Sequence, residues 1–382
     1  MANQISYGMV GGDIKAFIGE VHRKALNFDT RAKLVAGCFS IDKDLNYATA
    51  EAYNVDTTRV YEDFNDMAKA EAAKADGIDF VVITTPNHLH YAVSKAFLEA
   101  GIHVVCEKPL CFSVEEADEL KTLAETKGLL LGVTYTYVGY AMTKVMKQIV
   151  DNGDIGEVVS VNAEYVQEWL IDELDPSNSA TSKLSVWRMD PKFSGVSNCV
   201  GDIGTHIECI VAYVTGLKIK KLVATTDNFG QQLDLNANMI VEYENGARGA
   251  YWCSQVAAGR LNGLVVRIYG TKGSIEWEQE HPDYVRFTPK GEAPRLLSRG
   301  TGYITGDAAE YSRIPSGHPE GLIIAFANIY KNFLTAVEQK KAGLPVSGTG
   351  LDFPGVEEGY EGVKFVHAVV DSAKKGSVWV DL

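Results

Sequence analysis

The sequence predicts two regions: an α/β region with a doubly wound parallel sheet in residues 1–150, and an α+β region with a large, mostly antiparallel sheet in residues 151–382. In the first region, short apolar runs alternate with helical patterns, as in βαβ units. After Asn152-Gly153, which predicts a helix end, longer strand-like runs follow one another. A chain of 382 residues is long enough for two such domains.

Five strands are expected in the first region, and two helices stand out between them. The helix over 115–126 is introduced by Ser113 as an N-cap and has an acidic first turn. The other helix is expected over 91–100. The strands are expected at 5–10, 34–39, 80–84, 103–106 and 129–134.

The second region contains six strand-like runs, and Asn245-Gly246 between two of them is a strong two-residue hairpin signal. The strands are expected at 158–165, 222–226, 237–243, 247–255, 264–269 and 274–278. Helical patterns occur at 207–215, 323–339 and 356–372. We expect these helices to pack on one face of the antiparallel sheet.

Composition excludes several partners. Fifty acidic side chains against 36 basic ones give a formal charge of −14, and no basic patch offers a footprint for nucleic acid or anionic lipid. No apolar stretch reaches the roughly 18 residues needed to span a bilayer, and the first residues lack the basic segment of a secretory signal. These features predict a cytoplasmic protein that binds neither nucleic acid nor membrane.

A glycine-rich turn follows the first expected strand. It contains Gly11 and Gly12, and a helix-like stretch with Gly19 comes next. Such a turn lets backbone N–H groups approach a pyrophosphate, as in dinucleotide-binding folds. The spacing departs from G-x-G-x-x-G, because Asp13 occupies the second glycine position and extra residues precede Gly19. A tight turn in another kind of α/β protein is the alternative reading.

Four further segments carry polar residues at informative positions. Residues 85–90 (Thr-Pro-Asn-His-Leu-His) and Glu107-Lys108-Pro109 follow two expected parallel strands, at the carboxyl ends where α/β folds bind ligands. In the second region, Trp187-Arg188 precedes a segment in which Asp202 and His206 are four residues apart. This spacing places both side chains on one face near the start of a helix.

With Glu-Lys-Pro followed by Asp-x-x-x-His in this order, the sequence resembles the Gfo/Idh/MocA family of sugar and polyol oxidoreductases, which includes glucose-fructose oxidoreductase and inositol dehydrogenase. The resemblance covers nearly the whole chain, including the glycine turn and Gly270-Thr271-Lys272-Gly273. It implies a Rossmann NAD(P)-binding domain in residues 1–150, a substrate-binding and oligomerisation domain in residues 151–382, and NAD or NADP as cofactor.

The resemblance also implies catalytic roles. Lys108 would contact the nicotinamide ribose and a substrate hydroxyl, next to a Lys108-Pro109 bond that we expect to be cis. His206 would be the general base, and Asp202 would bind a neighbouring hydroxyl or orient the site. A helix N-terminus at His206 would favour the neutral imidazole. The plain alternatives are an exposed salt-bridging lysine and a structural histidine.

The remaining expected contacts surround these three residues. At the end of the second strand, Ser40 and Lys43 replace the acidic residue that favours NAD, although Asp42 is near, so both cofactors are expected to bind. Expected cofactor contacts are Gly11, Gly12, Ser40, Lys43, Thr85, Pro86, Asn87, His90, Glu107, Lys108, Trp187 and Arg188. Expected substrate contacts are Tyr135, Tyr137, Arg188, Asp202, His206 and His318. Trp187 and Arg188 could equally be structural, His318 could instead cap a helix, and no metal site is expected.

The sequence therefore predicts an NAD(P)-dependent dehydrogenase acting on a secondary alcohol of a sugar, glycoside or cyclitol. The alternative enzyme is an NAD-dependent glycosidase that works by transient C3 oxidation and elimination. A third reading, a dinucleotide sensor without catalysis, requires Lys108, Asp202 and His206 to coincide by chance. An exposed face of a large antiparallel sheet also favours a homo-oligomer.

Overall fold

The chain divides into two compact units in a computed structural model that describes residues 4–175 and 188–382. The first unit runs up to Thr136 and includes Leu322–Tyr360, and the second comprises Tyr137–Gly321 and Glu361–Leu382. This division differs from a single boundary near residue 150 in two ways. The helix before that boundary belongs to the second unit, and a segment near the C-terminus returns to the first.

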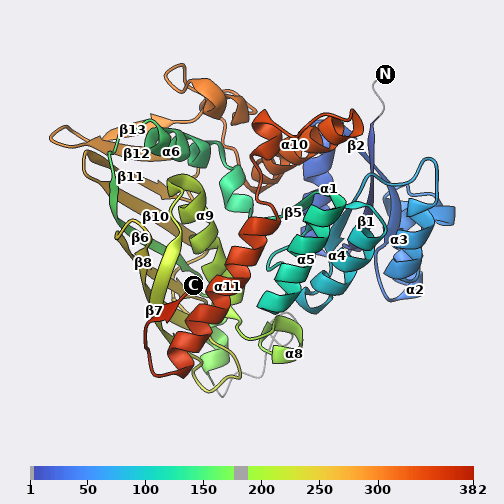
Figure 1. Ribbon diagram of the computed structural model, residues 1–382, viewed down its shortest axis with the longest axis horizontal. Coiled ribbons are helices and arrows are strands. Elements are labelled where there is room, and N and C mark those ends of the chain that lie inside the picture. Colours follow the sequence, from blue (N-terminus) through green and yellow to red (C-terminus); the bar gives the residue numbers. More distant parts are fainter. Residues whose placement is uncertain (1–3, 176–187) are drawn as a thin grey trace. The chain divides into compact units, whose positions relative to one another are not determined.

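The first unit contains a five-stranded parallel sheet of order β2-β1-β3-β4-β5. Figure 1 labels β1, β2 and β5 of this sheet. Its strands are β1 (Ile5–Gly11), β2 (Ala32–Cys38), β3 (Phe80–Thr84), β4 (His103–Cys106) and β5 (Leu131–Val133). The bounds of β3 and β4 are those expected from the sequence. This sheet confirms the predicted Rossmann-type architecture of the first region.

Helices flank this parallel sheet. They are α1 (Phe17–Phe28), α2 (Lys43–Ala52), α3 (Phe64–Ala72), α4 (His90–Glu99), α5 (Val114–Lys127) and α10 (Leu322–Lys341), together with the first residues of α11 (Val356–Lys374). The predicted cap of α5 is confirmed. Ser113 Oγ accepts a hydrogen bond from Glu116 N at 3.1 Å, and the Glu116 carboxylate accepts one from Ser113 N.

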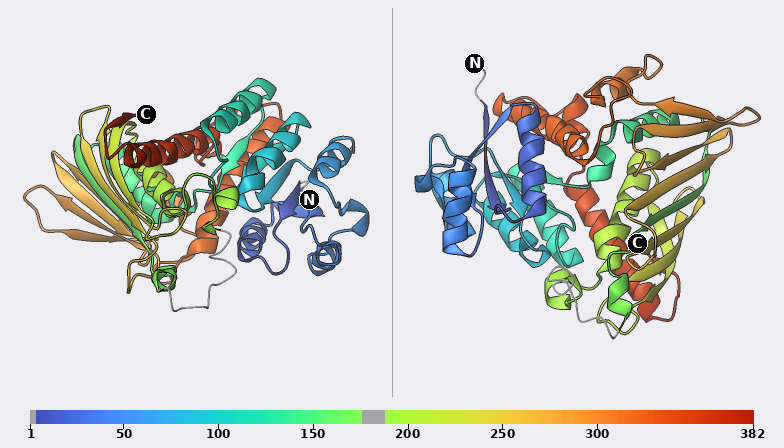
Figure 2. Two further views of the ribbon diagram at one scale, coloured as in Figure 1. Left: turned by 90° about the horizontal axis from the view of Figure 1, so that it is seen from below. Right: turned by 180° about the vertical axis from the view of Figure 1, so that it is seen from behind.

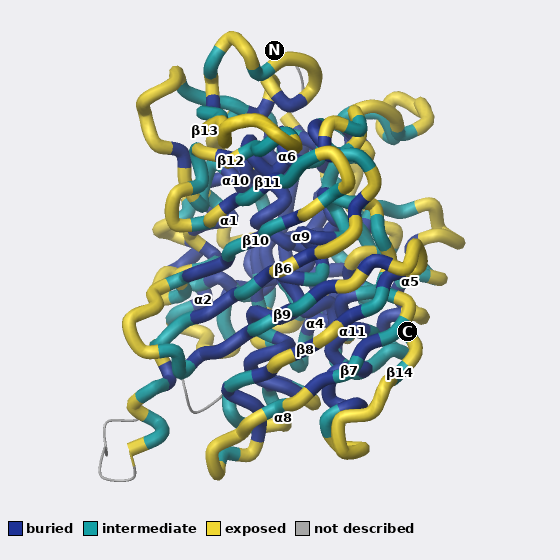
Figure 3. The backbone as a smooth tube through the Cα atoms, turned by 90° about the vertical axis from the view of Figure 1, so that its left-hand side faces the viewer, coloured by how far each residue is buried: buried dark blue, intermediate teal, exposed yellow. Residues whose placement is uncertain are grey.

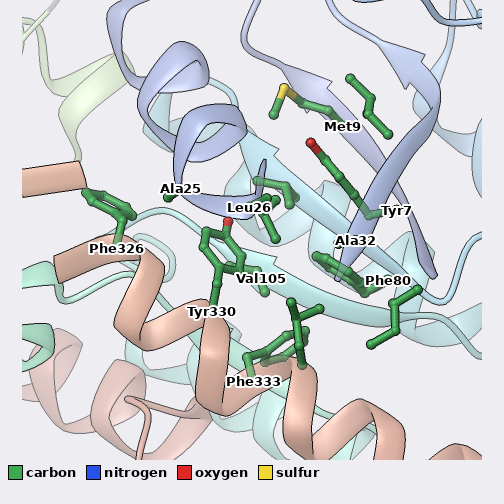
Figure 4. Close-up of a cluster of buried hydrophobic side chains, with 14 of the residues drawn as sticks. Tyr7, Met9, Ala25, Leu26, Ala32, Phe80, Val105, Phe326, Tyr330 and Phe333 are labelled. Atoms are coloured by element: carbon green, nitrogen blue, oxygen red, sulfur yellow. The ribbon is translucent and has the colours of Figure 1, made fainter. Parts of the chain in front are cut away.

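Helix α10 packs on the parallel sheet of the first unit. Its Tyr330 and Phe333 share a buried cluster with Tyr7 of β1 and Phe80 of β3 (Figure 4). The rings of Phe80 and Phe333 are 5.3 Å apart. The prediction that residues 323–339 cover the second sheet is therefore wrong, because an apolar helical face shows that a helix is buried but not which sheet buries it.

The second unit contains a nine-stranded sheet of order β13-β12-β11-β10-β6-β9-β8-β7-β14, in which all neighbours are antiparallel except β6 and β9. The strands are β6 (Val158–Val166), β7 (Ile219–Asp227), β8 (Asn236–Tyr243), β9 (Arg248–Ser254), β10 (Gly263–Gly270), β11 (Gly273–Glu278), β12 (Tyr284–Pro289), β13 (Arg295–Ser298) and β14 (Val380–Asp381). The helices are α6 (Ala141–Asp151), α8 (Pro191–Ser194), α9 (Thr205–Thr215) and the rest of α11.

Helices cover one face of this sheet and leave the other open. Helices α6 and α9 lie against the covered face (Figure 2). On β8, Met239 and Val241 are buried, whereas Asn238 and Ile240 are exposed on the opposite, open face. Figure 3 colours the backbone of the strands by burial. The hairpin between β8 and β9 turns at Asn245-Gly246 as predicted, with a φ of +86° at Gly246. Among the described residues, no helix is both long and apolar enough to cross a membrane.

Candidate active site

The order of the parallel sheet defines where its ligand site lies. The strand order reverses between β1 and β3, and open α/β sheets bind ligands beyond the carboxyl ends of the strands at such a point. The glycine turn follows β1, and Thr85 follows β3. The two turns lie against each other, because a Cβ built on Gly11 would be only 2.9 Å from the backbone of Thr84 and Thr85.

The glycine turn also allows α1 to approach β1 closely. Gly11 and Gly12 have φ values of +78° and +73°, in the left-handed region that favours glycine. A Cβ on Gly19 would overlap Gly12 Cα, so the first turn of α1 packs directly on the glycine turn. The close approach typical of a dinucleotide motif is thus achieved despite the longer spacing in the sequence.

Thr85 presents a polar atom without a partner at this point. Its Oγ1 is shielded from solvent and bonds to no atom of the described residues. A buried hydroxyl without a hydrogen bond costs free energy, so such an atom in a binding site is suited to a ligand. Together with the glycine turn, Thr85 fits the binding of a dinucleotide.

The end of β2 carries the residues expected to choose between NAD and NADP. Asp42 is the N-cap of α2 and accepts a hydrogen bond from Leu45 N at 3.0 Å. Ser40 Oγ accepts one from Asp42 N at 3.2 Å, and the exposed Lys43 pairs with Glu62 at 2.6 Å. Oδ1 of Asp42 therefore caps the helix, and Ser40, Asp42 and Lys43 all lie in the turn between β2 and the start of α2.

Lys108 lies just beyond β4, and its bond to Pro109 is cis, as expected. The neighbouring Glu107 is buried. Its carboxylate accepts hydrogen bonds from Thr134 Oγ1 at 2.7 Å and Lys108 N at 3.2 Å, and it faces His22 Nε2 at 2.8 Å. Burial by itself raises the pKa of Glu107, but the hydrogen bond and charge of His22, the charge of Lys108 and the Thr134 bond lower the pKa to about 2.

His22 and Tyr330 extend this buried network, and no motif in the sequence pointed to either residue. The other ring nitrogen of His22, Nδ1, is 2.5 Å from Tyr330 Oη. The three side chains come from α1, from the segment after β4 and from α10, so only the folded chain brings them together. The network fixes the Glu107 carboxylate directly beside Lys108.

His90 has an indirect role at this site. It is fully buried, and its ring nitrogens face the backbone oxygens of Pro109 at 2.7 Å and Thr85 at 3.0 Å. Burial lowers the pKa of His90, partly against these two hydrogen bonds. The imidazole thus joins the loops after β3 and β4, and the expected contact of His90 with the cofactor stays a prediction.

In the second unit, Asp202 and His206 lie on consecutive helical segments. Asp202 is in a π-helical turn, Val200–Gly204, which continues directly into α9 with His206 at its second residue. α9 therefore has no free N-terminus at His206, and the expectation that a helix end favours the neutral imidazole is wrong. A π-helical turn often occurs at a functional site, and the sequence pattern contains no sign of it.

His206 is buried among tyrosines. Its ring is 4.7 Å from the Tyr137 ring and 6.0 Å from the Tyr165 ring. The two tyrosine hydroxyls are hydrogen-bonded to each other, and Tyr165 Oη donates to Asn262 Oδ1 at 2.7 Å. Burial raises the pKa of Tyr137 to about 12, so this hydroxyl stays protonated at neutral pH. Tyr137 was expected from the sequence but Tyr165 was not, because its position in β6 looks like that of any strand residue.

Two described side chains donate hydrogen bonds to the Asp202 carboxylate. Arg188 Nη1 donates to Oδ1 at 2.6 Å, and Gln255 Nε2 donates to Oδ2 at 2.8 Å. The Arg188 guanidinium is also 6.0 Å from the ring of Trp169, a half-exposed aromatic residue that no sequence motif singled out. Trp187, expected at the cofactor, lies outside the described residues.

The remaining two expected substrate residues are Tyr135 and His318. Tyr135 belongs to the first unit and is almost completely buried, at 1% exposure. His318 belongs to the second unit, and its side chain is exposed while its backbone oxygen accepts a hydrogen bond from Arg299. The substrate contacts expected for Tyr135 and His318 stay predictions.

Comparison with known families agrees with this arrangement. Residues 5–135 match the family described as "Oxidoreductase family, NAD-binding Rossmann fold", and residues 143–276 match the "GFO/IDH/MocA C-terminal domain". The chain belongs to the Gfo/Idh/MocA oxidoreductase family. It is an NAD-binding oxidoreductase with a Rossmann domain.

Individual relatives extend over most or all of the chain. The uncharacterized oxidoreductase YfiI of Bacillus subtilis is 36% identical, with 100% of this chain and 98% of the relative covered. Levoglucosan dehydrogenase of Pseudarthrobacter phenanthrenivorans is 27% identical, with 80% of each chain covered. A solved inositol dehydrogenase homolog from Azotobacter vinelandii with NAD⁺ is 36% identical with a TM-score of 0.93, covering 100% of this chain and 98% of that one. Its complex with NADH and myo-inositol gives 35%, the same coverage and a TM-score of 0.90.

Proposed function

We propose that the protein is an NAD(P)-dependent dehydrogenase that oxidises a secondary alcohol of a sugar, glycoside or cyclitol, or reduces the corresponding ketone. The observation that carries this proposal is the buried group around His206. It combines a candidate base, the carboxylate of Asp202 and the hydroxyl groups of Tyr137 and Tyr165. Such a group can exchange a proton and hydrogen-bond several hydroxyls of a polyhydroxylated ring.

Each catalytic residue has one task in this proposal. His206 removes the proton from the reacting hydroxyl, and Asp202 binds a neighbouring hydroxyl or orients the site. The ammonium of Lys108 stabilises the negative charge that develops on the reacting oxygen. Bound nicotinamide supplies the hydride chemistry.

The relatives support the class of substrate. The A. vinelandii inositol dehydrogenase homolog was solved with myo-inositol, and a second relative is named for levoglucosan. Both compounds are rings that carry several hydroxyl groups. We therefore infer a cyclic polyol or sugar as the substrate.

We propose that NADP is accepted besides NAD. The support lies at the end of β2, where Ser40 and Lys43 can meet a 2′-phosphate and where Asp42 is held by α2. A carboxylate free to bind the ribose and repel the phosphate is the usual device for excluding NADP. In this chain the nearby carboxylate, Asp42, uses one oxygen to cap α2, which weakens that exclusion.

We also propose a homo-oligomer that uses the open face of the nine-stranded sheet. This face has a hollow of about 460 Å³, lined in part by Asn162, Thr225, Asn238, Ile240 and Trp252. Ile240 is 42% exposed at its edge. A second copy would cover these side chains. Light scattering coupled to size-exclusion chromatography tests the proposal, and replacing Ile240 with Asp should lower the measured mass if the face is the interface.

A panel of sugars, cyclitols and glycosides tests the enzymatic proposal, with NADH absorbance and product mass spectrometry as readouts. A ketone product with stoichiometric NADH supports the dehydrogenase. Release of an aglycone without net NADH would instead establish a glycosidase, and cofactor binding without any turnover would point to a sensor. His206→Ala should lose activity, whereas the matched control His281→Ala alters an exposed residue of the same unit and should keep it.

A further inference from the structure

Asp202 is held by a closed ring of three hydrogen bonds. Its backbone N donates to Asn198 O at 2.8 Å, and Asn198 Nδ2 donates to Gln255 Oε1 at 2.7 Å. Gln255 Nε2 then donates to Asp202 Oδ2 at 2.8 Å, which closes the ring. The ring therefore fixes both the main chain and the carboxylate of Asp202.

A buried carboxylate anchors this ring. Asp234 accepts hydrogen bonds from Asn198 N at 3.0 Å and from Val200 N at 2.9 Å, at the start of the π-helical turn. Its backbone oxygen also accepts one from Cys199 N at 3.1 Å. Burial raises the pKa of Asp234, against these hydrogen bonds. Asp234 thus sets the position of the segment that carries Asp202.

Only one orientation of the Gln255 side-chain amide matches the hydrogen-bonding groups of Asn198 and Asp202. The side chain is completely buried at the end of β9, and the main chain is fixed by bonds from Gln255 N to Leu235 O at 2.9 Å and from Leu170 N to Gln255 O at 3.0 Å. Its amide oxygen faces an amide donor of Asn198, and its NH₂ group faces a carboxylate, which accepts only. A rotated amide would place donor against donor and acceptor against acceptor.

We propose that Gln255 is a positioning residue for the reaction, acting through Asp202, and this inference rests on the proposed function. Arg188 holds one carboxylate oxygen of Asp202, and Gln255 holds the other. The carboxylate plane is therefore fixed before substrate binds, which reduces the ordering that binding would otherwise require. Asp202 itself makes the substrate contact, and Gln255 makes none.

Gln255→Glu tests the donor with little change of shape. The substitution replaces the NH₂ group with an oxygen that faces the Asp202 carboxylate, and both burial and the neighbouring charge raise the pKa of the introduced carboxyl group. When protonated, this carboxyl group donates as the glutamine does, and when ionised it repels Asp202. The loss of kcat/KM relative to wild type should therefore be largest above neutral pH, about 10- to 100-fold, and should shrink as the pH falls.

Two further variants distinguish the positioning role of Gln255 from a nonspecific effect of substitution on the folded protein. Gln255→Met removes the donor without adding charge, so it should lower kcat/KM at every pH, with the relative loss independent of pH. Gln148→Glu makes the same substitution in α6, at a half-buried residue that lies beside Gly306. This variant should keep the wild-type dependence of kcat/KM on pH. NAD titration should give unchanged affinity in all three variants. A Gln255→Glu profile parallel to wild type, or a loss equal to that of Gln148→Glu, would overturn the proposal.

A double-mutant cycle of melting temperatures tests the hydrogen bond between Gln255 and Asp202 without a measurement of activity. Gln255→Glu should lower the melting temperature increasingly as pH rises, because an acid with a raised folded pKa loses its stabilising protonated form at high pH. Adding Asp202→Asn restores a donor opposite the introduced carboxylate, so the double variant should melt higher at pH 8 than Gln255→Glu alone. Additive effects would refute the contact. A wild-type protein that turns over no polyol would refute the proposed function while leaving this cycle interpretable.

Discussion

Glu107→Gln provides a quantitative test of the buried network beside Lys108. Lowering the pKa of Glu107 from 4.5 to about 2 corresponds to about 3 kcal/mol of stability at pH 7, since each pKa unit is worth about 1.4 kcal/mol. Glutamine keeps an acceptor for His22 and Thr134 but loses the charge. We therefore expect the variant to be less stable than wild type by up to about 3 kcal/mol at pH 7.

The depressed pKa of Glu107 determines the direction in which its contribution to stability changes with pH. Because the folded pKa is depressed, the stabilisation is complete above the unfolded value of 4.5 and disappears as pH falls through about 2. Between pH 7 and pH 3, the stability difference between wild type and variant should shrink by about 2 kcal/mol. Urea unfolding followed by circular dichroism at several pH values measures this difference.

The matched control is Glu119→Gln, which alters an exposed carboxylate of α5 that pairs with Lys95. It should change stability little at any pH, because surface ion pairs are weak. A Glu107→Gln penalty that stays constant from pH 7 to pH 3 would contradict the reasoning. The cost would then come from lost packing or hydrogen bonds, and the ionised carboxylate would not be the source of stability.

The other predictions concern the ligand sites. Thr85→Val removes the unpartnered hydroxyl, so calorimetric titration should show NAD affinity falling about 2- to 12-fold while the melting temperature stays level or rises. NAD and NADP should differ in affinity by less than about a thousandfold, roughly 4 kcal/mol, and Ser40→Asp should widen that gap against NADP; a larger preference in wild type would refute this. His206→Ala and Lys108→Ala should each retain dinucleotide binding but lower kcat by about 10²- to 10⁴-fold, with effects in the double variant that do not add. If His206→Ala keeps more than about a tenth of kcat, another residue is the base.

Most strands and the residues of chemical interest could be predicted from local patterns in the sequence, although β12, β13 and β14 were not expected. Short apolar runs predicted most strands, Ser113 as an N-cap predicted the start of α5, and Asn245-Gly246 predicted a hairpin. Polar residues after strands drew attention to Thr85 and Lys108, because the carboxyl ends of parallel strands form one edge. All these signals depend on neighbours within a few residues.

Tertiary structure alone decided which distant segments meet. The apolar face of α10 fits either sheet by its pattern, and only packing against Phe80 places it on the parallel one. His22 and Tyr330 reach Glu107 from separate helices, and Gln255 reaches Asp202 across 53 positions of the chain. Periodicity along the chain determines that a side chain is buried, but its partner is determined by how the elements pack, because buried polar groups must find their hydrogen bonds in three dimensions.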